Sequence, residues 1–299
     1  MDYKKAIYED NKVILEGVKN FNIKQILECG QCFRWEKKSE LDYIVIAYGR
    51  VIEVVQEDDK VTILNSNEED FNNIWFEYFD LERDYSKIKE ELSKDEILKK
   101  SVDYGYGIRI LNQEPFELVI SFIVSARNSI PSIKKTIKKI SERWGTEIEY
   151  KGEKFYTFPT PEMLKDATED EIRETGASFR SKYIVDTVAN INNDLDNLEG
   201  VYNLERITSL TDDECHIALQ EFKGVGAKVA DCIMLFSMSK YSAFPVDVWV
   251  KRAMMHFYNA EEGSLNKIRI FARNEFKDLS GFAQQYLFYY ARENNIKID

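Results

Sequence analysis

The sequence predicts an α+β fold, in which an antiparallel β-sheet domain over residues 1–107 precedes a mostly α-helical domain over residues 108–299. β-Branched and aromatic residues alternate with polar ones through residues 1–65, which is typical of strands. From Ile108 onwards, apolar residues recur with a helical period. Within residues 214–258, a glycine-rich turn between two helical segments adds a helical hairpin to the second domain.

The N-terminal domain is predicted to be a sheet built from short hairpins. Its expected strands, rich in β-branched and aromatic residues, are residues 12–16, 32–35, 43–47 and 51–55. Turn-forming residues at 48–50 and 58–60 separate strands of this sheet. Residues 71–81 are dense in aromatic side chains and predict an element that packs on the sheet. Residues 87–100 predict one charged amphipathic helix.

Helix start and stop signals divide the second domain. Pro115 is placed as the first residue of a helix that is apolar on all sides and therefore buried. The next helix turns isoleucines inward and lysines outward. Gly176 is expected to end one helix, and another begins near Phe179. Ser264 and Ser280 are cap-type residues at the starts of the last two helices.

The composition is that of a soluble globular protein, since 44% of the 299 residues are hydrophobic and 31% are charged. There is no membrane-length apolar run and no signal peptide, so we expect a cytoplasmic protein, nucleoid-associated in a bacterium, that contacts no membrane. A net charge of −12 disfavours broad nucleic-acid binding. Residues 127–144 nevertheless carry six Lys or Arg against one Glu, which permits a local basic surface; a solvated helix face is the alternative.

The four cysteines suit a reducing compartment without a disulfide framework. Cys29 and Cys32 form a C-x-x-C pattern, but a zinc or redox site needs further close ligands. Cys215 and Cys232 are 17 residues apart, and the chain has two histidines. We therefore predict no metal site, and a zinc or redox protein that uses Cys29 and Cys32 remains an alternative.

A stretch of helix, glycine turn, helix, proline loop and helix organises the chain. Residues 211–214, Thr-Asp-Asp-Glu, form a capping box at the start of the first helix. Residues 223–226, Lys-Gly-Val-Gly, are too short and glycine-rich for anything but a hairpin between helices. The second helix starts at Ala227. Pro245 interrupts the chain before the third helix, and Asp247 is placed to cap it.

Two chemical groups in this stretch stand out. Lys228 lies in the first turn of the second helix, and Asp247 follows it by 19 residues. Because Lys228, Cys232 and Phe236 are spaced at i, i+4 and i+8, an amine, a thiol and a ring are expected to line one wall of a cavity. The alternative interpretations are an ordinary surface lysine and an aspartate that only caps its helix.

Residues 224–232, Gly-Val-Gly-Ala-Lys-Val-Ala-Asp-Cys, and residues 244–248, Phe-Pro-Val-Asp-Val, resemble the helix-hairpin-helix DNA glycosylases. Within that superfamily they are most similar to the 8-oxoguanine DNA glycosylase/AP lyases, and other stretches extend the resemblance over nearly the whole chain. The resemblance implies a base excision repair enzyme that acts as a monomer on double-stranded DNA containing 8-oxoguanine.

The resemblance implies that Lys228 and Asp247 are catalytic. Lys228, desolvated and close to a helix N-terminus, would attack the sugar C1′, displace the base and leave a Schiff base that permits β-elimination. Asp247, ionised, would stabilise positive charge on the sugar and orient the amine. No cofactor is required, although the family also suggests a structural monovalent cation or calcium ion on the hairpin carbonyls.

The resemblance also assigns a base pocket. Gly30 would offer its carbonyl to the N7 hydrogen that 8-oxoguanine has and guanine lacks, because a residue without Cβ lets backbone reach a base edge. Gln284 and Phe288, at i and i+4, would present an amide to the Watson–Crick edge and a ring to one face of the base. Cys232 would cover the other face, and Phe236 completes the wall.

The resemblance assigns further residues to DNA: Arg127, Asn128 and Ser132 near the orphaned cytosine, Phe179 as a wedge, Arg180 at the estranged base, and Gly224, Gly226 and Trp249 near phosphates. An apolar wedge holds an unstacked step open, and helix N-termini bind phosphate. Trp249 replaces a histidine of the family, and Ser132 replaces an arginine. Because arginine is a usual reader of base edges, we predict a weakened preference for cytosine opposite the lesion.

Two other interpretations stay open. The first is a glycosylase of the same superfamily for adenine mispairs or alkylated purines. Lys228 disfavours the purely hydrolytic members, and the lack of cysteines beyond Cys232 excludes the iron–sulfur cluster of the endonuclease III branch and disfavours the adenine enzyme. The second is a non-catalytic helix-hairpin-helix module that only grips DNA phosphates.

Overall fold

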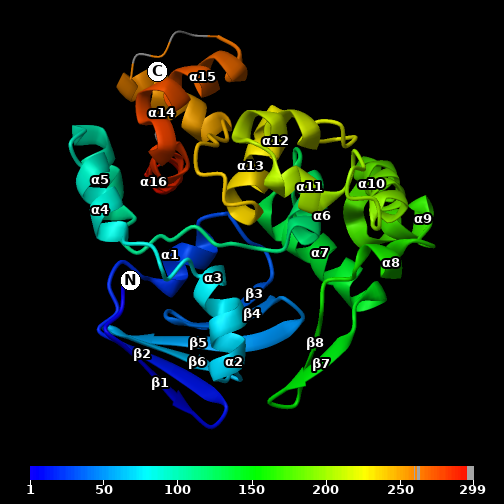
Figure 1. Ribbon diagram of the computed structural model, residues 1–299, viewed down its shortest axis with the longest axis horizontal. Coiled ribbons are helices and arrows are strands. Elements are labelled where there is room, and N and C mark those ends of the chain that lie inside the picture. The colour runs from blue at the N-terminus through cyan, green and yellow to red at the C-terminus, as the bar shows by residue number, and fades with distance from the viewer. Residues whose placement is uncertain (259, 261–262, 295–299) are drawn as a thin grey trace.

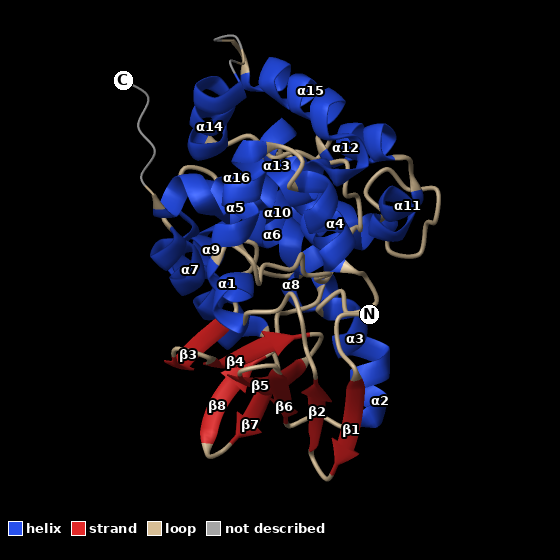
Figure 2. Ribbon diagram, turned by 90° about the vertical axis from the view of Figure 1, so that its left-hand side faces the viewer, coloured by secondary structure: helices blue, strands red, loops and turns tan. Residues whose placement is uncertain are grey.

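The computed structural model describes residues 1–258, 260 and 263–294, and its elements are labelled in Figure 1. Figure 2 shows a β-sheet at one end of the molecule and a body of helices above it, so the predicted α+β class is confirmed. The sheet has six antiparallel strands in the order β1-β2-β6-β5-β4-β3. Its strands are β1 (Lys5–Glu9), β2 (Lys12–Glu16), β3 (Trp35–Ser39), β4 (Asp42–Ala47), β5 (Arg50–Glu57) and β6 (Lys60–Leu64).

A helical run covers one face of this sheet, and it confirms the element predicted over residues 71–81. The run consists of α2 (Glu68–Asp70), a π-helical turn (Phe71–Trp75) and α3 (Phe76–Tyr78). Val54 and Ile63 face each other across β5 and β6, and both are buried in one cluster with Trp75. The sheet therefore has its own apolar core, which packs the strands against this helical run.

The segment before β3 differs from the prediction. Residues 32–35 are predicted as a strand, but only Trp35 belongs to β3. The chain first forms α1 (Ile23–Glu28), which Asn22 caps by accepting from the amide of Gln25 at 3.0 Å. It then turns through Gly30, which has φ 87°. Because glycine tolerates this left-handed conformation, the turn can direct the loop toward the helical body.

The predicted single helix over residues 87–100 is wrong. Residues of this segment belong to two helices, α4 (Tyr85–Leu92) and α5 (Glu96–Tyr104). Asp95 accepts from the amides of Ile97 and Leu98 at 2.9 and 2.8 Å and so starts the second helix. A side-chain cap of this kind is strongest for aspartate, asparagine and serine, which explains why the helical pattern restarts there.

The prediction of helices from Ile108 to the end of the chain missed a hairpin. β7 (Glu147–Tyr150) and β8 (Glu153–Tyr156) are joined by Lys151 and Gly152, which both have positive φ. Tyr150 and Phe155 of this hairpin are buried in one cluster with residues of β4 and β5. The hairpin therefore extends from the helical body back to the sheet.

The helical body contains the remaining helices. They are α6 (Pro115–Ser125), α7 (Ile130–Trp144), α8 (Pro161–Leu164), α9 (Glu169–Ile172), α10 (Ser181–Asp194), α11 (Leu204–Ser209), α12 (Asp212–Leu219), α13 (Ala227–Ser237), α14 (Val248–Tyr258), α15 (Leu265–Phe276) and α16 (Ser280–Glu293). The predicted helix starts at Pro115 and Ala227 and the Ser264 cap are confirmed. Among the described helices, none has the length and apolar character needed to cross a bilayer.

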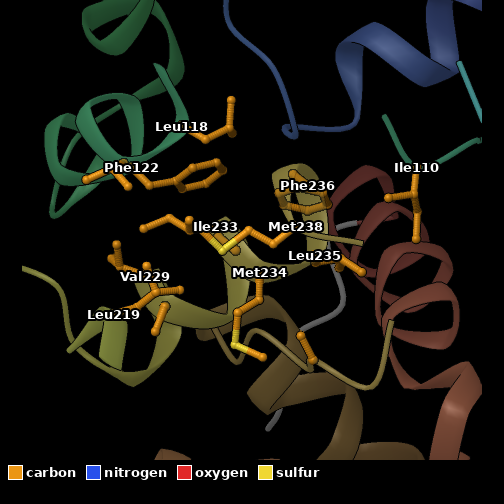
Figure 3. Close-up of a cluster of buried hydrophobic side chains, with 14 of the residues drawn as sticks. Ile110, Leu118, Phe122, Leu219, Val229, Ile233, Met234, Leu235, Phe236 and Met238 are labelled. Carbon is orange, nitrogen blue, oxygen red and sulfur yellow. The ribbon is translucent and has the colours of Figure 1, made fainter. Parts of the chain in front are cut away.

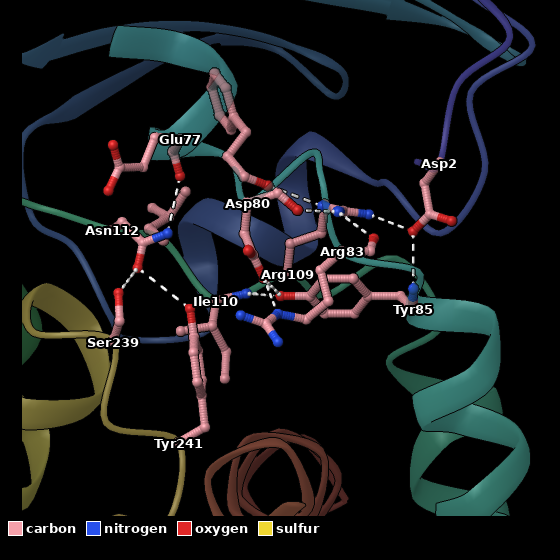
Figure 4. A network of polar contacts seen from close by, with 12 residues as sticks. Asp2, Glu77, Asp80, Arg83, Tyr85, Arg109, Ile110, Asn112, Ser239 and Tyr241 are labelled. Atoms are coloured by element: carbon pink, nitrogen blue, oxygen red, sulfur yellow. Dashed lines mark hydrogen bonds and ion pairs between the residues drawn. The ribbon is translucent and has the colours of Figure 1, made fainter. Parts of the chain in front are cut away.

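A buried polar network fastens the N-terminus to the segments that lead into the helical body (Figure 4). Arg109 is fully buried and pairs with Asp2 at 2.7 Å. The hydroxyl of Tyr85 donates to Asp80 at 2.8 Å and accepts from the amide of Ile110 at 2.9 Å. Because a buried charge is costly without partners, these bonds fix the two parts relative to each other. The domain boundary at residue 107 stays a prediction, since α5 also packs on α16 (Figure 1).

Candidate active site

The hairpin between α12 and α13 has the predicted geometry. Thr211 and Glu214 form a capping box at the start of α12. Gly224 adopts φ 87°, and a Cβ there would lie 2.8 Å from the ring of Tyr183. Since both the backbone and the neighbouring ring require glycine at this position, the turn is tightly specified. α13 then begins at Ala227, with its first-turn amides at the hairpin.

α13 lies within the core of the helical body (Figure 3). Ile233 and Leu235 are fully buried, and Phe236 stacks on Phe122 of α6 with ring centroids 5.8 Å apart. Close packing of this kind resists rotation of the helix about its axis. Lys228 lies in the first turn of the same helix. Its side chain therefore extends from a backbone that is held in place.

One cavity collects both predicted catalytic residues and the whole predicted base pocket. It is lined by Cys29, Gly30, Phe122, Lys228, Cys232, Phe236, Pro245, Asp247, Gln284, Gln285 and Phe288. These residues come from the turn after α1, from α6 and α13, from the loop before α14, and from α16. The cavity has a volume of about 50 Å³ and opens to the surface of the protein.

Lys228 is half-buried at the wall of this cavity. Its Nζ lies 5.3 Å from the centroid of the Phe122 ring and next to the thiol of Cys232. Burial raises the pKa of Cys232 to about 11, and the neighbouring charge of Lys228 opposes this shift. Cys232 is therefore a neutral thiol at pH 7, which offers a soft apolar surface and does not compete as a nucleophile.

Asp247 lines the same cavity from the loop before α14. Its Oδ1 accepts from the amide of Val250 at 2.8 Å, so the predicted helix cap is confirmed. Burial raises the pKa of Asp247. Amide hydrogen bonds from Val250 and Trp249, and the nearby charge of Lys228, oppose this shift because they favour the ionised form. The carboxylate thus combines a structural bond with an electrostatic interaction across the cavity.

α16 supplies the opposite wall. Gln284 is buried, and its Nε2 donates to the carbonyl of Pro245 at 3.1 Å. Because a carbonyl only accepts, this bond fixes the amide orientation and leaves Gln284 Oε1 buried without a partner in the described structure. Phe288 is half-buried, and a Cβ added to Gly30 would lie 3.4 Å from its ring. The cavity therefore has an aromatic face, a free acceptor and an approachable backbone.

The loops predicted to meet DNA lie outside this cavity. Arg127 and Ser132 are exposed, and Asn128 donates from its amide to the carbonyl of Val124 at 3.1 Å. The Phe179 side chain is 49% exposed although it is large and apolar, which is the property that a wedge requires. The DNA contacts of these residues stay predictions.

Arg180 is held within the protein by neighbouring backbone carbonyls. It is buried, and it donates to the backbone carbonyls of Ala126 and Arg127 at 2.8 and 3.1 Å. Its guanidinium therefore fastens the loop before α7, and its contact with an estranged base stays a prediction. Trp249 is half-buried, and the guanidinium of Arg252 lies 5.1 Å from its ring.

The basic face predicted for α7 is partly neutralised by the protein itself. Lys138 pairs with Glu36 at 3.1 Å, and Arg143 pairs with two carboxylates at 2.8 and 2.9 Å. The Nζ of Lys134 lies 3.1 Å from the centroid of the Trp35 ring. Since each of these cations has a protein partner, the surface left for DNA phosphates is smaller than the charge count suggests.

The four cysteines are all buried and free. Burial raises the pKa of Cys29 to about 12 and that of Cys215 to about 11, so both remain protonated at neutral pH. In the part of the chain that the structure describes, no group of three or more His, Cys, Asp or Glu side chains is placed to hold a metal ion. These observations give no support to the zinc or redox alternative.

Sequence reasoning missed four residues of the cavity, namely Cys29, Phe122, Pro245 and Gln285. Phe122 lies in a helix that is apolar on all sides, so no sequence signal separates it from its core neighbours. Gln285 is a second glutamine within a largely apolar segment. Its polarity is a signal that could have identified it, because buried polar side chains need partners.

The helical hairpin, the fold and the cavity together define the class of helix-hairpin-helix DNA glycosylases. Residues 13–119 match the family described as 8-oxoguanine DNA glycosylase, N-terminal domain, and residues 120–276 match the HhH-GPD superfamily base excision DNA repair proteins. The chain belongs to the 8-oxoguanine DNA glycosylase family, whose members are N-glycosylase/DNA lyases.

Named relatives agree with this assignment. A probable N-glycosylase/DNA lyase of Methanothermobacter thermautotrophicus is 32% identical over 238 residues, which cover 73% of this chain and 72% of that protein. The N-glycosylase/DNA lyase of Saccharomyces cerevisiae is 29% identical over 267 residues, covering 82% and 70%. A crystal structure of Clostridium acetobutylicum 8-oxoguanine glycosylase/lyase, in complex with double-stranded DNA containing cytosine opposite 8-oxoG, is 57% identical with a TM-score of 0.95 over 99% of this chain and 100% of that one. The protein is a base excision repair DNA glycosylase/lyase.

Proposed function

We propose that the enzyme excises 8-oxoguanine from double-stranded DNA through a Schiff base on Lys228 and then cleaves the strand by β-elimination. The shared cavity carries this proposal, because an amine and a carboxylate there flank groups suited to hold a planar base. A base cannot be excised from within the stack, so the enzyme extrudes the damaged nucleotide into the cavity.

The chemistry uses Lys228 and Asp247 in different roles. The unprotonated amine of Lys228 attacks the sugar C1′ as the bond to the base nitrogen breaks, and the electron pair leaves with the base, which takes up a proton. Ionised Asp247 offsets the positive charge that builds on the sugar. The amine on C1′ then opens the sugar ring to a Schiff base. Loss of a C2′ proton expels the 3′ phosphate and completes β-elimination.

Base recognition relies on the remaining walls of the cavity. The carbonyl of Gly30 accepts from the N7 hydrogen of 8-oxoguanine, which guanine lacks. The unpartnered Oε1 of Gln284 accepts from donors on the Watson–Crick edge. Cys232 and Phe288 cover the two faces of the base, and Phe236 closes the wall. A single added hydrogen bond can discriminate strongly when the site is built to satisfy it.

Sodium borohydride trapping tests this function directly. The purified protein is incubated with a duplex that contains 8-oxoguanine, and the expected result is a covalent protein–DNA adduct, since borohydride reduces a Schiff base to a stable amine. Binding of the duplex without an adduct would contradict the lyase function and would leave a helix-hairpin-helix module that only grips DNA.

The position of Gly30 yields a prediction about the pocket. Gly30→Ala is expected to slow excision of 8-oxoguanine by about 10-fold or more, because φ 87° strains any other residue and the new Cβ would stand 3.4 Å from Phe288. Single-turnover excision measures the effect. Gly49→Ala is the matched control, since Gly49 has φ 67° in an open turn with no atom within 4 Å of the added Cβ. Equal rate losses in the two variants would show that Gly30 has no particular role in binding the base.

The position of Ser132 predicts the choice of opposite base. Ser132 is exposed in the first turn of α7 and offers a short hydroxyl in place of a guanidinium. We expect Ser132→Arg to increase the preference for cytosine by about 10-fold, because an arginine can make paired hydrogen bonds to a base edge. Excision rates opposite C, A, G and T measure this preference. A wild-type enzyme that already strongly prefers cytosine would contradict the prediction.

We propose that a single protein chain makes all the contacts with DNA. Phe179 acts as the wedge, Arg127, Asn128 and Ser132 lie on the orphaned-base side, and the amides of Gly224 and Gly226 bind a phosphate. Because all these residues and the cavity belong to one chain, we propose that the enzyme acts as a monomer, in the compartment that holds the DNA. The carbonyls of Lys223, Gly224 and Val225 accept no backbone hydrogen bond from the described residues, which fits a cation on the hairpin.

A further inference from the structure

Gln285 is a buried polar residue of the cavity that the proposed chemistry does not use. Its side chain is 2% exposed and lines the cavity beside Gln284. Within the described residues its Nε2 has no hydrogen-bond partner. Such a donor is costly to bury, because it has lost water without gaining an acceptor. An arrangement of this kind indicates a partner that arrives with the ligand.

Two adjacent glutamines that line the cavity thus leave complementary groups without partners in the described structure. The Nε2 of Gln284 is engaged by the Pro245 carbonyl at 3.1 Å, so this residue offers its oxygen as an acceptor. For Gln285 the group without a partner is the Nε2 donor. Both side chains belong to α16, which is buried along most of its length and is therefore held rigidly. One acceptor and one donor side by side form a pattern that can read a base edge.

We propose that Gln285 is a specificity-determining residue whose Nε2 donates to O6 of the extruded base. The inference rests on the proposed excision of 8-oxoguanine. A guanine-type Watson–Crick edge presents the acceptor O6 beside the donors N1–H and N2–H, which matches a donor at Gln285 and an acceptor at Gln284. An adenine-type edge has an amino donor at the position of O6, and this donor would oppose the Gln285 amide.

The energetic consequence is discrimination between purine types. A guanine-type base satisfies the buried donor, whereas an adenine-type base leaves it unpaired and buries a second donor against it. When a site is built to make a hydrogen bond, an analogue that lacks the matching group leaves a buried polar atom unpaired. The affinity lost in this way is larger than the affinity that the bond adds for the correct ligand. Gln285 therefore separates 8-oxoguanine from 8-oxoadenine, which share O8 and the N7 hydrogen that Gly30 is proposed to read.

The test compares binding of three duplexes by variants of the full-length protein. Lys228→Gln serves as the background, so that no substrate is consumed, and the duplexes carry 8-oxoguanine, 8-oxoadenine or a tetrahydrofuran abasic analogue opposite cytosine. Adding Gln285→Met is expected to weaken 8-oxoguanine binding by about 10-fold and to leave the abasic duplex unchanged. Gln285→Glu, which replaces the donor with acceptors, is expected to weaken 8-oxoguanine binding further and to narrow or reverse the preference over 8-oxoadenine.

Controls separate recognition from folding. Gln113→Met makes the same exchange at a buried glutamine outside the cavity, whose Nε2 donates to the Gln31 carbonyl at 2.9 Å, and it should change the melting temperature without changing the preference between bases. An unchanged ratio of 8-oxoguanine to 8-oxoadenine binding in Gln285→Met overturns the inference, and so does an equal loss for all three duplexes. Failure of the wild-type enzyme to form a borohydride adduct overturns the proposed function instead.

Discussion

Lys228→Gln is expected to abolish borohydride trapping and to lower the rate of 8-oxoguanine excision by on the order of 10³-fold or more. The substitution keeps a polar side chain of similar length but removes the amine that bonds to C1′. Lys228 is half-buried beside the thiol of Cys232, and α13 is held by its own apolar residues. The variant should therefore fold and bind DNA, and its loss should fall on the chemical step.

Lys223→Gln is the matched control for this experiment. Lys223 lies at the start of the same hairpin, but its amine pairs with Asp186 on the surface and it does not line the cavity. Both variants lose one positive charge close to the bound DNA, so any general electrostatic effect on affinity is shared. Trapping should persist in Lys223→Gln and disappear in Lys228→Gln. An adduct of wild-type yield in Lys228→Gln would assign the Schiff base to another amine.

The sequence predicted the parts of the site that depend on local periodicity. Lys228, Cys232 and Phe236 were placed on one wall by helical spacing alone, and the structure has all three around one cavity. The Asp247 cap followed from its position after Pro245 and before a helical segment. Helical spacing and capping act over a few residues, which explains why a single sequence was sufficient for them.

The parts that depend on tertiary contacts could not be predicted in the same way. Gly30 lies beside Phe288 in the structure, although the two residues are near opposite ends of the sequence. Only the resemblance to the family predicted that they lie close together. The strands of the β7–β8 hairpin have only four residues each, which is a short span in which to recognise alternation. The backbone carbonyls of Ala126 and Arg127 accept hydrogen bonds from Arg180, and no local pattern in the sequence shows which distant backbone acceptors an arginine will find.

Asp247→Asn is expected to reduce the rate of excision by about 100-fold or more, because the charge that offsets the developing positive sugar is removed. The fold should survive, since the asparagine oxygen can accept the same hydrogen bond from the amide of Val250. Burial raises the pKa of Asp247 in the folded protein, so ionisation of this carboxyl opposes folding at neutral pH. The variant should therefore melt at a temperature no lower than that of the wild type at pH 7.

The pH profile distinguishes a catalytic carboxylate from a helix cap. Because the ionised form is the active one and its pKa is raised, wild-type excision should fall on acidification at a higher pH than for an exposed aspartate. This acid limb should be missing from Asp247→Asn. Asp84→Asn is the control, since Asp84 caps α4 by accepting from the amide of Ser86 at 3.0 Å, away from the cavity, and its rate and profile should match the wild type. If Asp247→Asn keeps the wild-type rate and the same loss of rate on acidification, the carboxylate is only a helix cap. The positive charge on the sugar then builds up without help from Asp247.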